Sequence, residues 1–354
     1  MPVNQINDTV RVGPKILGDG QPAFIVVELG VCHEQDVRVA EHFIEVAAQA
    51  GADAVKVESF QADELVMDKT ITHTYGTAQG QVTENYYDLL KRLELSLDDH
   101  ARLKHKADEC GLLFFPTVAT PRCVDFFQAL DVCAYKLASP DIVNHPLQRY
   151  LAGTNKPIFL DTGGSFIYEI EQAVLNLHEA GARDLIIMHN PSGYPAPPEK
   201  TDLRMIRTLK SVFRLPVGLS CHTPGFDMVM ASLALGANVI EKPITRNRAI
   251  QGPEHIFSLL DREADDFVRR IRAMELALGN PRRTRVNENS LPRFTGRRGI
   301  YAARDLAPGE VLTQDDVILA KPERGISVIH LDQILGRALK ETVRRHQPIT
   351  WEVI

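Results

Sequence analysis

The sequence lacks the features that mark secreted, membrane-spanning and nucleic-acid-binding proteins. Its five cysteines are odd in number and have no CxxC spacing, which argues against a disulfide framework and a zinc knuckle. The N-terminus has no apolar segment behind a basic start, and no run of about 18 apolar residues occurs. Acidic residues exceed basic ones, for a formal net charge of -6, which disfavours nucleic acid and anionic membranes as partners. We therefore expect a cytoplasmic protein.

What the sequence does contain is a repeated strand and helix pattern. A chain of 354 residues suits a barrel of about 250 residues and one small module. Eight short apolar runs alternate with amphipathic stretches, which is typical of βα units around a parallel sheet. The predicted strands span residues 24–30, 54–58, 113–118, 134–138, 157–162, 185–190, 216–222 and 239–244. Eight repeats predict an α/β protein with a (β/α)8 TIM barrel.

The stretches between these strands are predicted helices, because their apolar residues recur every three or four positions and each stretch ends at a glycine. The glycines predicted as helix C-caps are Gly51, Gly111, Gly181 and Gly236. Two connections are unusual. Residues 59–96 are too long for a simple βα loop, and residues 190–200 are rich in proline. We expect the first to cover a site and the second to form a rigid wall of a pocket.

The periodic pattern ends near residue 280, where polar and basic residues dominate as in an interdomain linker. We predict a barrel domain at 1–282, a linker at 283–295 and a compact β-rich module at 296–354. The module has short strands, a PGE turn and a TQDD helix start. It is too small to build much of a core.

Polar residues at the carboxyl ends of the predicted strands are the candidates for chemistry, because TIM barrels build their active sites there. The candidates are Glu28, Lys56, Glu58, Thr117, Lys136, Ser139, Asp161, Thr162, His189, Ser220, His222, Glu241 and Lys242. Capping or ordinary hydrogen bonding explains Thr117, Asp161 and Thr162 equally well. A lone histidine such as His222 is more often a core or loop residue than a metal ligand.

Three lysines, Lys56, Lys136 and Lys242, lie within or directly after apolar strands. Burial of an ammonium group is costly unless an anion pairs with it, so three such lysines predict an anion in the mouth of the barrel. Phosphate and carboxylate satisfy an ammonium group equally. The neighbouring hydroxyl groups would add neutral donors around a phosphate; they belong to Ser139, Ser192 and Ser220. A phosphorylated or carboxylated small substrate is therefore favoured.

A series of motifs, in order and spacing, resembles the sialic-acid synthase family of phosphoenolpyruvate-dependent nonulosonate synthases. These motifs are FIVVELGVCHE, AGADAVKVESF, FFPTV, AYKLASPDI, KPIFLDTGG, GLSCHTPG, LGANVIEKPIT and GPEH. The segment AARDLAPGEVLTQDDV, followed by ERGIS, resembles that family's C-terminal antifreeze-like (SAF) domain, of the β-clip type. The resemblance spans almost the whole chain.

The resemblance implies the condensation of phosphoenolpyruvate with the open-chain aldehyde of an N-acylated hexosamine. The products would be a 2-keto-3-deoxy sugar acid and inorganic phosphate, with cleavage of a carbon–oxygen bond. In the family a divalent ion, manganese or magnesium, polarises the aldehyde. The resemblance also implies a homodimer in which the small domain closes the partner's active site.

Matched to the family motifs, several residues acquire expected roles. Phosphoenolpyruvate would be held by Lys56, Lys136, Ser139, Ser192, Ser220 and Lys242, and the sugar by Glu28, Tyr194, Lys321 and Arg324. His222 falls on the first metal-binding histidine. The residues expected to act in catalysis are Glu28, Lys56, Glu58 and His222.

Other positions depart from the family pattern. Pro243 replaces the second metal-binding histidine and has no side chain that can coordinate a metal. Two cysteines differ from the pattern: Cys221 replaces an aspartate and Cys32 replaces an asparagine. In addition, Glu58 replaces a glutamine and Ser192 replaces an asparagine. Three outcomes stay open: His222 with a replacement ligand (Glu58, His33 or Cys32), catalysis by hydrogen bonds alone, or loss of the condensation.

Two alternative functions stay open at this point. In a Schiff-base aldolase or lyase, Lys136 or Lys242 would attack a carbonyl with its pKa lowered by neighbouring cations. In a degenerate paralogue the chain would bind sugar acids without catalysis, a reading motivated by Pro243. The retained charged residues argue against the second alternative.

Overall fold

The computed structural model describes residues 7–279 and 295–354. The chain divides into two compact units, Met1–Gly279 and Asn280–Ile354. The predicted end of the barrel domain at residue 282 and the predicted linker up to residue 294 lie outside the described residues. No helix in the described part of the chain is long and apolar enough to cross a membrane.

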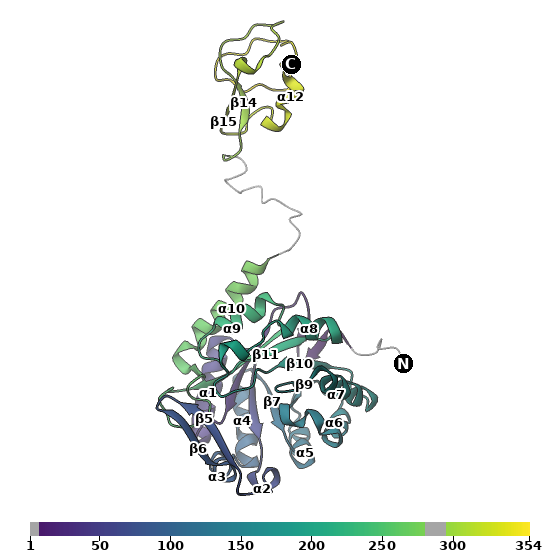
Figure 1. The fold of residues 1–354 in the computed structure, drawn as a ribbon, viewed down its shortest axis with the longest axis vertical. Helices are drawn as coiled ribbons and strands as arrows, with labels where there is room; N and C mark the ends of the chain where they lie inside the picture. The colour runs from purple at the N-terminus through teal and green to yellow at the C-terminus, as the bar shows by residue number, and fades with distance from the viewer. Residues whose placement is uncertain (1–6, 280–294) are drawn as a thin grey trace. The chain divides into compact units, whose positions relative to one another are not determined.

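The first unit is a closed barrel of parallel strands surrounded by helices (Figure 1). Neighbouring strands follow the chain order, and the last pairs with both the one before it and the first, which closes the barrel. The barrel strands are β3 (Phe24–Gly30), β4 (Ala54–Ser59), β7 (Leu113–Val118), β8 (Tyr135–Leu137), β9 (Ile158–Asp161), β10 (Leu185–His189), β11 (Val217–Ser220) and β12 (Val239–Thr245). All eight predicted strands are confirmed, and so is the TIM barrel.

The helices outside the barrel are also those that the periodicity predicts. They are α1 (Val37–Ala50), α4 (Leu97–Glu109), α5 (Pro121–Ala129), α6 (His145–Ala152), α7 (Ile167–Glu179), α8 (Met205–Phe213), α9 (Asp227–Ala234) and α10 (Ala264–Leu278). In α1 the side chain of Asp36 accepts a hydrogen bond from Arg38 N, and the helix ends at Gly51 with φ of 79°. That left-handed conformation favours glycine, so the predicted C-cap is confirmed.

The amino ends of the barrel strands are covered by a small hairpin, β1 (Val10–Val12) with β2 (Lys15–Leu17). Val10, Val12 and Leu17 are fully buried and pack in one cluster with apolar side chains from inside the barrel. Burial of these side chains closes this end of the barrel. Access to the interior is therefore from the carboxyl ends of the strands.

The long connection after β4 is more ordered than the predicted loop. It contains α2 (Ala62–Leu65), an antiparallel hairpin of β5 (Thr72–Thr77) and β6 (Gly80–Asn85), and α3 (Tyr86–Leu93). Gly76 N donates to Tyr194 O at 2.8 Å. The hairpin therefore contacts the proline-rich loop after β10.

The second unit is a small β module with a hydrophobic core of its own, so the expectation that it is too small to build much of a core is wrong. It has one antiparallel pair, β14 (Gly299–Ala302) with β15 (Val317–Ala320), and a short helix, α12 (Leu331–Ile334). The side chains buried in its core include Ile300, Ile326, Ile334 and Ile349. The β-rich character predicted for this part of the chain is confirmed.

Candidate active site

A polar cavity of about 70 Å³ lies at the carboxyl ends of the barrel strands. This inner cavity is lined by Glu28, Lys56, Glu58, Thr117, Lys136, Ala138, Ser139, Pro140, Asp161, Asn190, Tyr194, Ser220 and His222. An adjoining hollow of about 390 Å³, the outer hollow, shares several of these residues and extends over Gly163, Gly164 and Ser192. The outer hollow alone has the volume of a typical small-ligand site, roughly 300 to 1,000 Å³.

Lys56 is at the centre of the ionic contacts in the inner cavity. Its side chain is 1% exposed and donates a hydrogen bond to Glu28 Oε1. Oxygen atoms of Glu58 and Glu241 each lie 3.7 Å from Lys56 Nζ. Residues 56 and 58 both reach the cavity because alternate residues of a strand face the same side.

Lys136 forms the second centre, on the opposite side of Glu241. Its ammonium group donates to Glu241 Oε1 and lies 2.9 Å from Asp161 Oδ2. Ser220 Oγ also donates to Glu241 Oε1, at 2.9 Å. One carboxylate oxygen therefore links both lysines and the serine into a single buried network.

These pairings correct the argument made from the lysines alone. Buried lysines were expected to require an anionic ligand, but Glu28, Glu241 and Asp161 already neutralise Lys56 and Lys136 within the chain. Burial of the lysines is therefore no evidence for a bound anion. What remains informative is that both ammonium groups line the same cavity.

Several buried polar atoms of the network have no hydrogen-bond partner in the described part of the chain. They are Glu28 Oε2, Thr117 Oγ1, Asp161 Oδ1, His222 Nδ1 and Glu241 Oε2. An unsatisfied buried polar group costs free energy, and such groups in native proteins generally find a ligand or water. The inner cavity therefore offers a set of unused hydrogen-bonding positions to a ligand.

The carboxyl groups of the network differ in their affinity for protons. Burial raises the pKa of Glu28 to about 7, against the opposing charge of Lys56. Burial would also raise the pKa of Glu241, but Lys136 and Lys56 outweigh it and hold the pKa at about 2. Glu241 is the permanent counter-ion, and Glu28 has the near-neutral pKa of a group that gives and takes protons.

His222 follows β11 and forms one side of the inner cavity. Its ring stacks on Tyr194 with centroids 4.9 Å apart and lies 5.4 Å from the ring of Phe257. Burial, reinforced by the charge of Lys136, lowers the pKa of His222 to about 3. The imidazole is therefore neutral at physiological pH and can donate from one ring nitrogen and accept at the other.

The residues present do not fit the family's two-histidine metal site. Pro243 lies two residues after Glu241 on the same face of β12 and pairs in register with Glu28, so the family's second ligand position is a proline inside the barrel. Of the proposed replacements, Glu58 lines the cavity, whereas Cys32 lies 3.6 Å from Ser258 Oγ, away from it. Among the described residues, no group of three or more His, Cys, Asp or Glu side chains is arranged to hold a metal ion.

His33, the third proposed replacement, also lies outside the inner cavity. Its Nδ1 accepts a hydrogen bond from Gln35 N at 3.1 Å, and the side chain is 3% exposed. This hydrogen bond makes His33 a cap of the loop after β3. His222 is therefore the one histidine among the residues that line the cavity.

Lys242 is not among the residues that line the inner cavity, so the geometry gives no support to its expected role in holding phosphoenolpyruvate. It lies on the opposite face of β12 from Glu241, donates to Thr223 O, and places Nζ 3.6 Å from Cys221 Sγ. Cys221 is 2% exposed and belongs to the apolar core.

The same geometry disfavours the Schiff-base alternative. A nucleophilic lysine needs a lowered pKa. Burial alone would lower the pKa of Lys136, but the charges of Asp161 and Glu241 outweigh it and raise the pKa. The pKa of Lys242 is lowered by burial, but this side chain faces away from the cavity.

The remaining candidates fall into three places. Ser139 and Ser220 line the inner cavity, and Ser139 Oγ accepts a hydrogen bond from Gly163 N at 2.9 Å. Ser192 lines only the outer hollow of the two. Lys321 and Arg324 belong to the second unit, so their expected contact with the sugar stays a prediction.

The network also contains three residues for which the family motifs imply no role, namely Glu241, Asp161 and Asn190. Asn190 Nδ2 donates to Asp161 Oδ2 at 3.1 Å, which holds that carboxylate beside Lys136. Glu241 and Asp161 were among the strand-end candidates. Their importance becomes visible once each lysine is paired with its carboxylate across the barrel.

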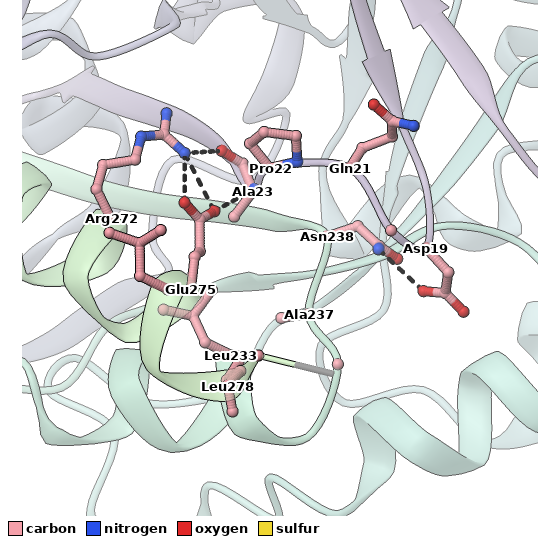
Figure 2. A pocket seen from close by; sticks show the side chains of 14 residues that line it. Asp19, Gln21, Pro22, Ala23, Leu233, Ala237, Asn238, Arg272, Glu275 and Leu278 are labelled. Carbon is pink, nitrogen blue, oxygen red and sulfur yellow. Dashed lines mark hydrogen bonds and ion pairs between the residues drawn. The ribbon is translucent and has the colours of Figure 1, made fainter. Parts of the chain in front are cut away.

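A larger hollow, of about 590 Å³, lies near the amino ends of β3 and β12 (Figure 2). Its polar groups pair with one another: Arg272 donates to Ala23 O at 2.8 Å and to Glu275, and Asn238 Nδ2 donates to Asp19 Oδ1 at 3.2 Å. Barrel enzymes carry their catalytic groups at the opposite end. This hollow is therefore not the candidate active site.

Together, the barrel, the ionisable cavity at the carboxyl ends of its strands and the small β module define a two-domain (β/α)8-barrel protein. The chain belongs to the NeuB family, which matches residues 43–283, and residues 297–354 match the SAF domain. The resemblance seen in the sequence motifs is confirmed.

Individual relatives agree with this assignment. The chain is 32% identical over 347 residues to N,N'-diacetyllegionaminic acid synthase from Legionella pneumophila, covering 97% of each chain. It is 35% identical to an uncharacterized protein from Methanocaldococcus jannaschii, covering 98% of each. The crystal structure of N-acetylneuraminic acid synthetase from Leptospira borgpetersenii superposes with a TM-score of 0.71 at 27% identity, covering 80% of this chain and 98% of that one.

Proposed function

We propose that this protein condenses phosphoenolpyruvate with the open-chain aldehyde of an aldose. The enol carbon forms a bond to the aldehyde carbon, water adds at the resulting cationic carbon, and the carbon–oxygen bond to phosphate breaks. The products are a 2-keto-3-deoxy sugar acid and inorganic phosphate. Membership of the NeuB family, with relatives named as nonulosonic acid synthases, supports this reaction class.

The observation that carries the proposal is that Lys56 and Lys136 line one cavity and are bridged by Glu241. A lysine ammonium has three donors. The hydrogen bond to Glu28 uses one donor of Lys56, and the contacts with Glu241 and Asp161 use two of Lys136. The remaining donors can bind the phosphate or carboxylate of phosphoenolpyruvate without dismantling the network.

Glu28 and His222 are suited to the proton steps of this reaction. The aldehyde oxygen gains a proton as the carbon–carbon bond forms, and a carboxyl group with a pKa of about 7 is suited to supply it. Neutral His222 can hydrogen-bond the same oxygen and polarise the carbonyl. We assign polarisation to these hydrogen bonds because position 243 offers no metal ligand.

Phosphate release from phosphoenolpyruvate in the presence of aldoses tests the proposal, with keto-acid formation measured in parallel. Lys136→Met should lower kcat/KM at least 100-fold, because it removes a donor to the substrate and unbalances the network. Lys340→Met, an exposed change in the second unit, should leave it unchanged. Equal activity of Lys136→Met and the wild type would contradict the assignment.

Two further parts of the proposal are independent of the reaction itself. Activity should persist after chelation of divalent metals, which an assay with and without ethylenediaminetetraacetate measures. A homodimer is also proposed, and light scattering of the purified chain tests it. A monomer with full activity would contradict the proposed homodimer but not the proposed reaction.

A further inference from the structure

The inner cavity contains more carboxylates than lysines. Three carboxylates and two lysines line it, and a fourth carboxylate, Glu241, contacts both lysines. Proton uptake by Glu28, whose pKa is raised to about 7 mainly by burial, removes one negative charge at most. Bound phosphoenolpyruvate adds negative charge. A second substrate that brought no cation would leave a water-poor cavity with an uncompensated excess of anions, which is costly.

The excess is concentrated around Glu58. Its side chain is 31% exposed, and it lies 3.7 Å from Lys56, which is already hydrogen-bonded to Glu28. Glu28 Oε2 beside it is buried and has no hydrogen-bond partner among residues 7–279 and 295–354. An ionised carboxylate accepts hydrogen bonds and cannot donate one, so Glu58 cannot bind an acyl carbonyl as an amide side chain would.

Glu254 extends the same acidic region behind the cavity. It is 6% exposed and accepts a hydrogen bond from Val31 N at 3.2 Å. Burial, with added repulsion from Glu58 and Glu28, raises its pKa well above the usual range. A cation bound near these three glutamates would favour their ionised forms.

We propose, on the basis of the proposed function, that the acceptor aldose carries a free, protonated amino group that pairs with Glu58 beside Glu28. Of the cations available to a condensing enzyme, a metal ion lacks a ligand set among the described residues. An ammonium group supplies the missing charge and several donors at once. Glu58 is then the residue that selects an amino sugar over its N-acyl counterpart.

The test uses purified full-length protein, phosphoenolpyruvate and matched aldoses in which one substituent, at C2, C4 or C6, is amino, acetamido or hydroxyl. Phosphate release gives kcat/KM for each. The best amino acceptor should exceed its acetamido and hydroxyl counterparts at least tenfold. Glu58→Gln should reduce that ratio at least tenfold, and Glu179→Gln, which removes the same charge from an exposed position, should not change it.

The outcomes separate the two proposals. Phosphate release that favours an acetamido or hydroxyl acceptor, or a ratio unaffected by Glu58→Gln, overturns the amino-sugar inference and leaves the condensation intact. Absence of phosphate release with every acceptor overturns the proposed function and the inference with it. Glu58→Gln is isosteric at a partly exposed site, so circular dichroism should show an unchanged fold.

Discussion

Replacement of Glu241 by glutamine tests the ionic network most severely, because one carboxylate oxygen serves three partners. Oε1 of Glu241 accepts from Lys136 and from Ser220, and lies 3.7 Å from Lys56. Lys136 and Lys56, acting against burial, lower the pKa of Glu241 from 4.5 to about 2, which corresponds to roughly 3 kcal/mol of stabilisation of the charged form. Removal of one partner of a buried ion pair costs about 3 to 5 kcal/mol. We expect Glu241→Gln to lower the free energy of unfolding of the barrel by that amount.

Urea denaturation followed by circular dichroism measures this change, with the transition of the barrel analysed separately because the chain has two units. In the wild type, the contribution of Glu241 is present above pH 4.5 and is lost as the pH falls towards 2. Glu241→Gln should lack that dependence. A Glu241→Gln variant within about 0.5 kcal/mol of the wild type, the range of ordinary surface substitutions, would refute the reasoning.

Three further predictions follow from named contacts. Burial raises the pKa of Glu28 to about 7, so the stability that its protonated form contributes should fall as the pH rises from 4.5 to about 7. Urea titrations at several pH values should show this decrease in the wild type and not in Glu28→Gln. Pro243→His places an imidazole on the face of β12 that points into the barrel. Calorimetric titration with manganese should therefore show tighter binding to this variant than to the wild type. Equal binding would contradict the placement of residue 243. A Cβ on Gly218 would lie 2.5 Å from Met188 Sδ and 2.7 Å from Val239 Cβ. Gly218→Ala should therefore lower the free energy of unfolding by about 1 to 3 kcal/mol. Unchanged stability would show that the neighbouring side chains can move to make room for the methyl group.

The barrel could be predicted from the sequence because each strand and helix is encoded locally. The strand Phe24–Gly30 is buried along its whole length. The helix that follows it, α1, begins after the N-cap Asp36 and ends at Gly51. The β5 and β6 hairpin was missed because its strands lie in a largely polar segment, although Tyr75 within it is buried. The alternation in Thr72–Thr77 and the turn before Gly80 were the available signals.

The site was harder to predict for two physical reasons. Both faces of a barrel strand are buried, so hydrophobicity does not tell which of Glu241 and Lys242 faces the interior. Pairing is also non-local: Lys136 and its counter-ion Glu241 are 105 residues apart in the chain. The sequence therefore indicated which charged residues lie at the mouth, but not that they neutralise one another.

The central claim, a condensation with carbon–oxygen cleavage in the cavity of Lys56 and Lys136, has a direct isotopic test. Phosphoenolpyruvate labelled with oxygen-18 at the bridging oxygen is incubated with the full-length protein and an aldose acceptor, and the products are analysed by mass spectrometry. The account predicts that the label leaves with inorganic phosphate and that a keto acid of matching mass forms. Label retained in the keto acid, or no product in the presence of any acceptor, would contradict it.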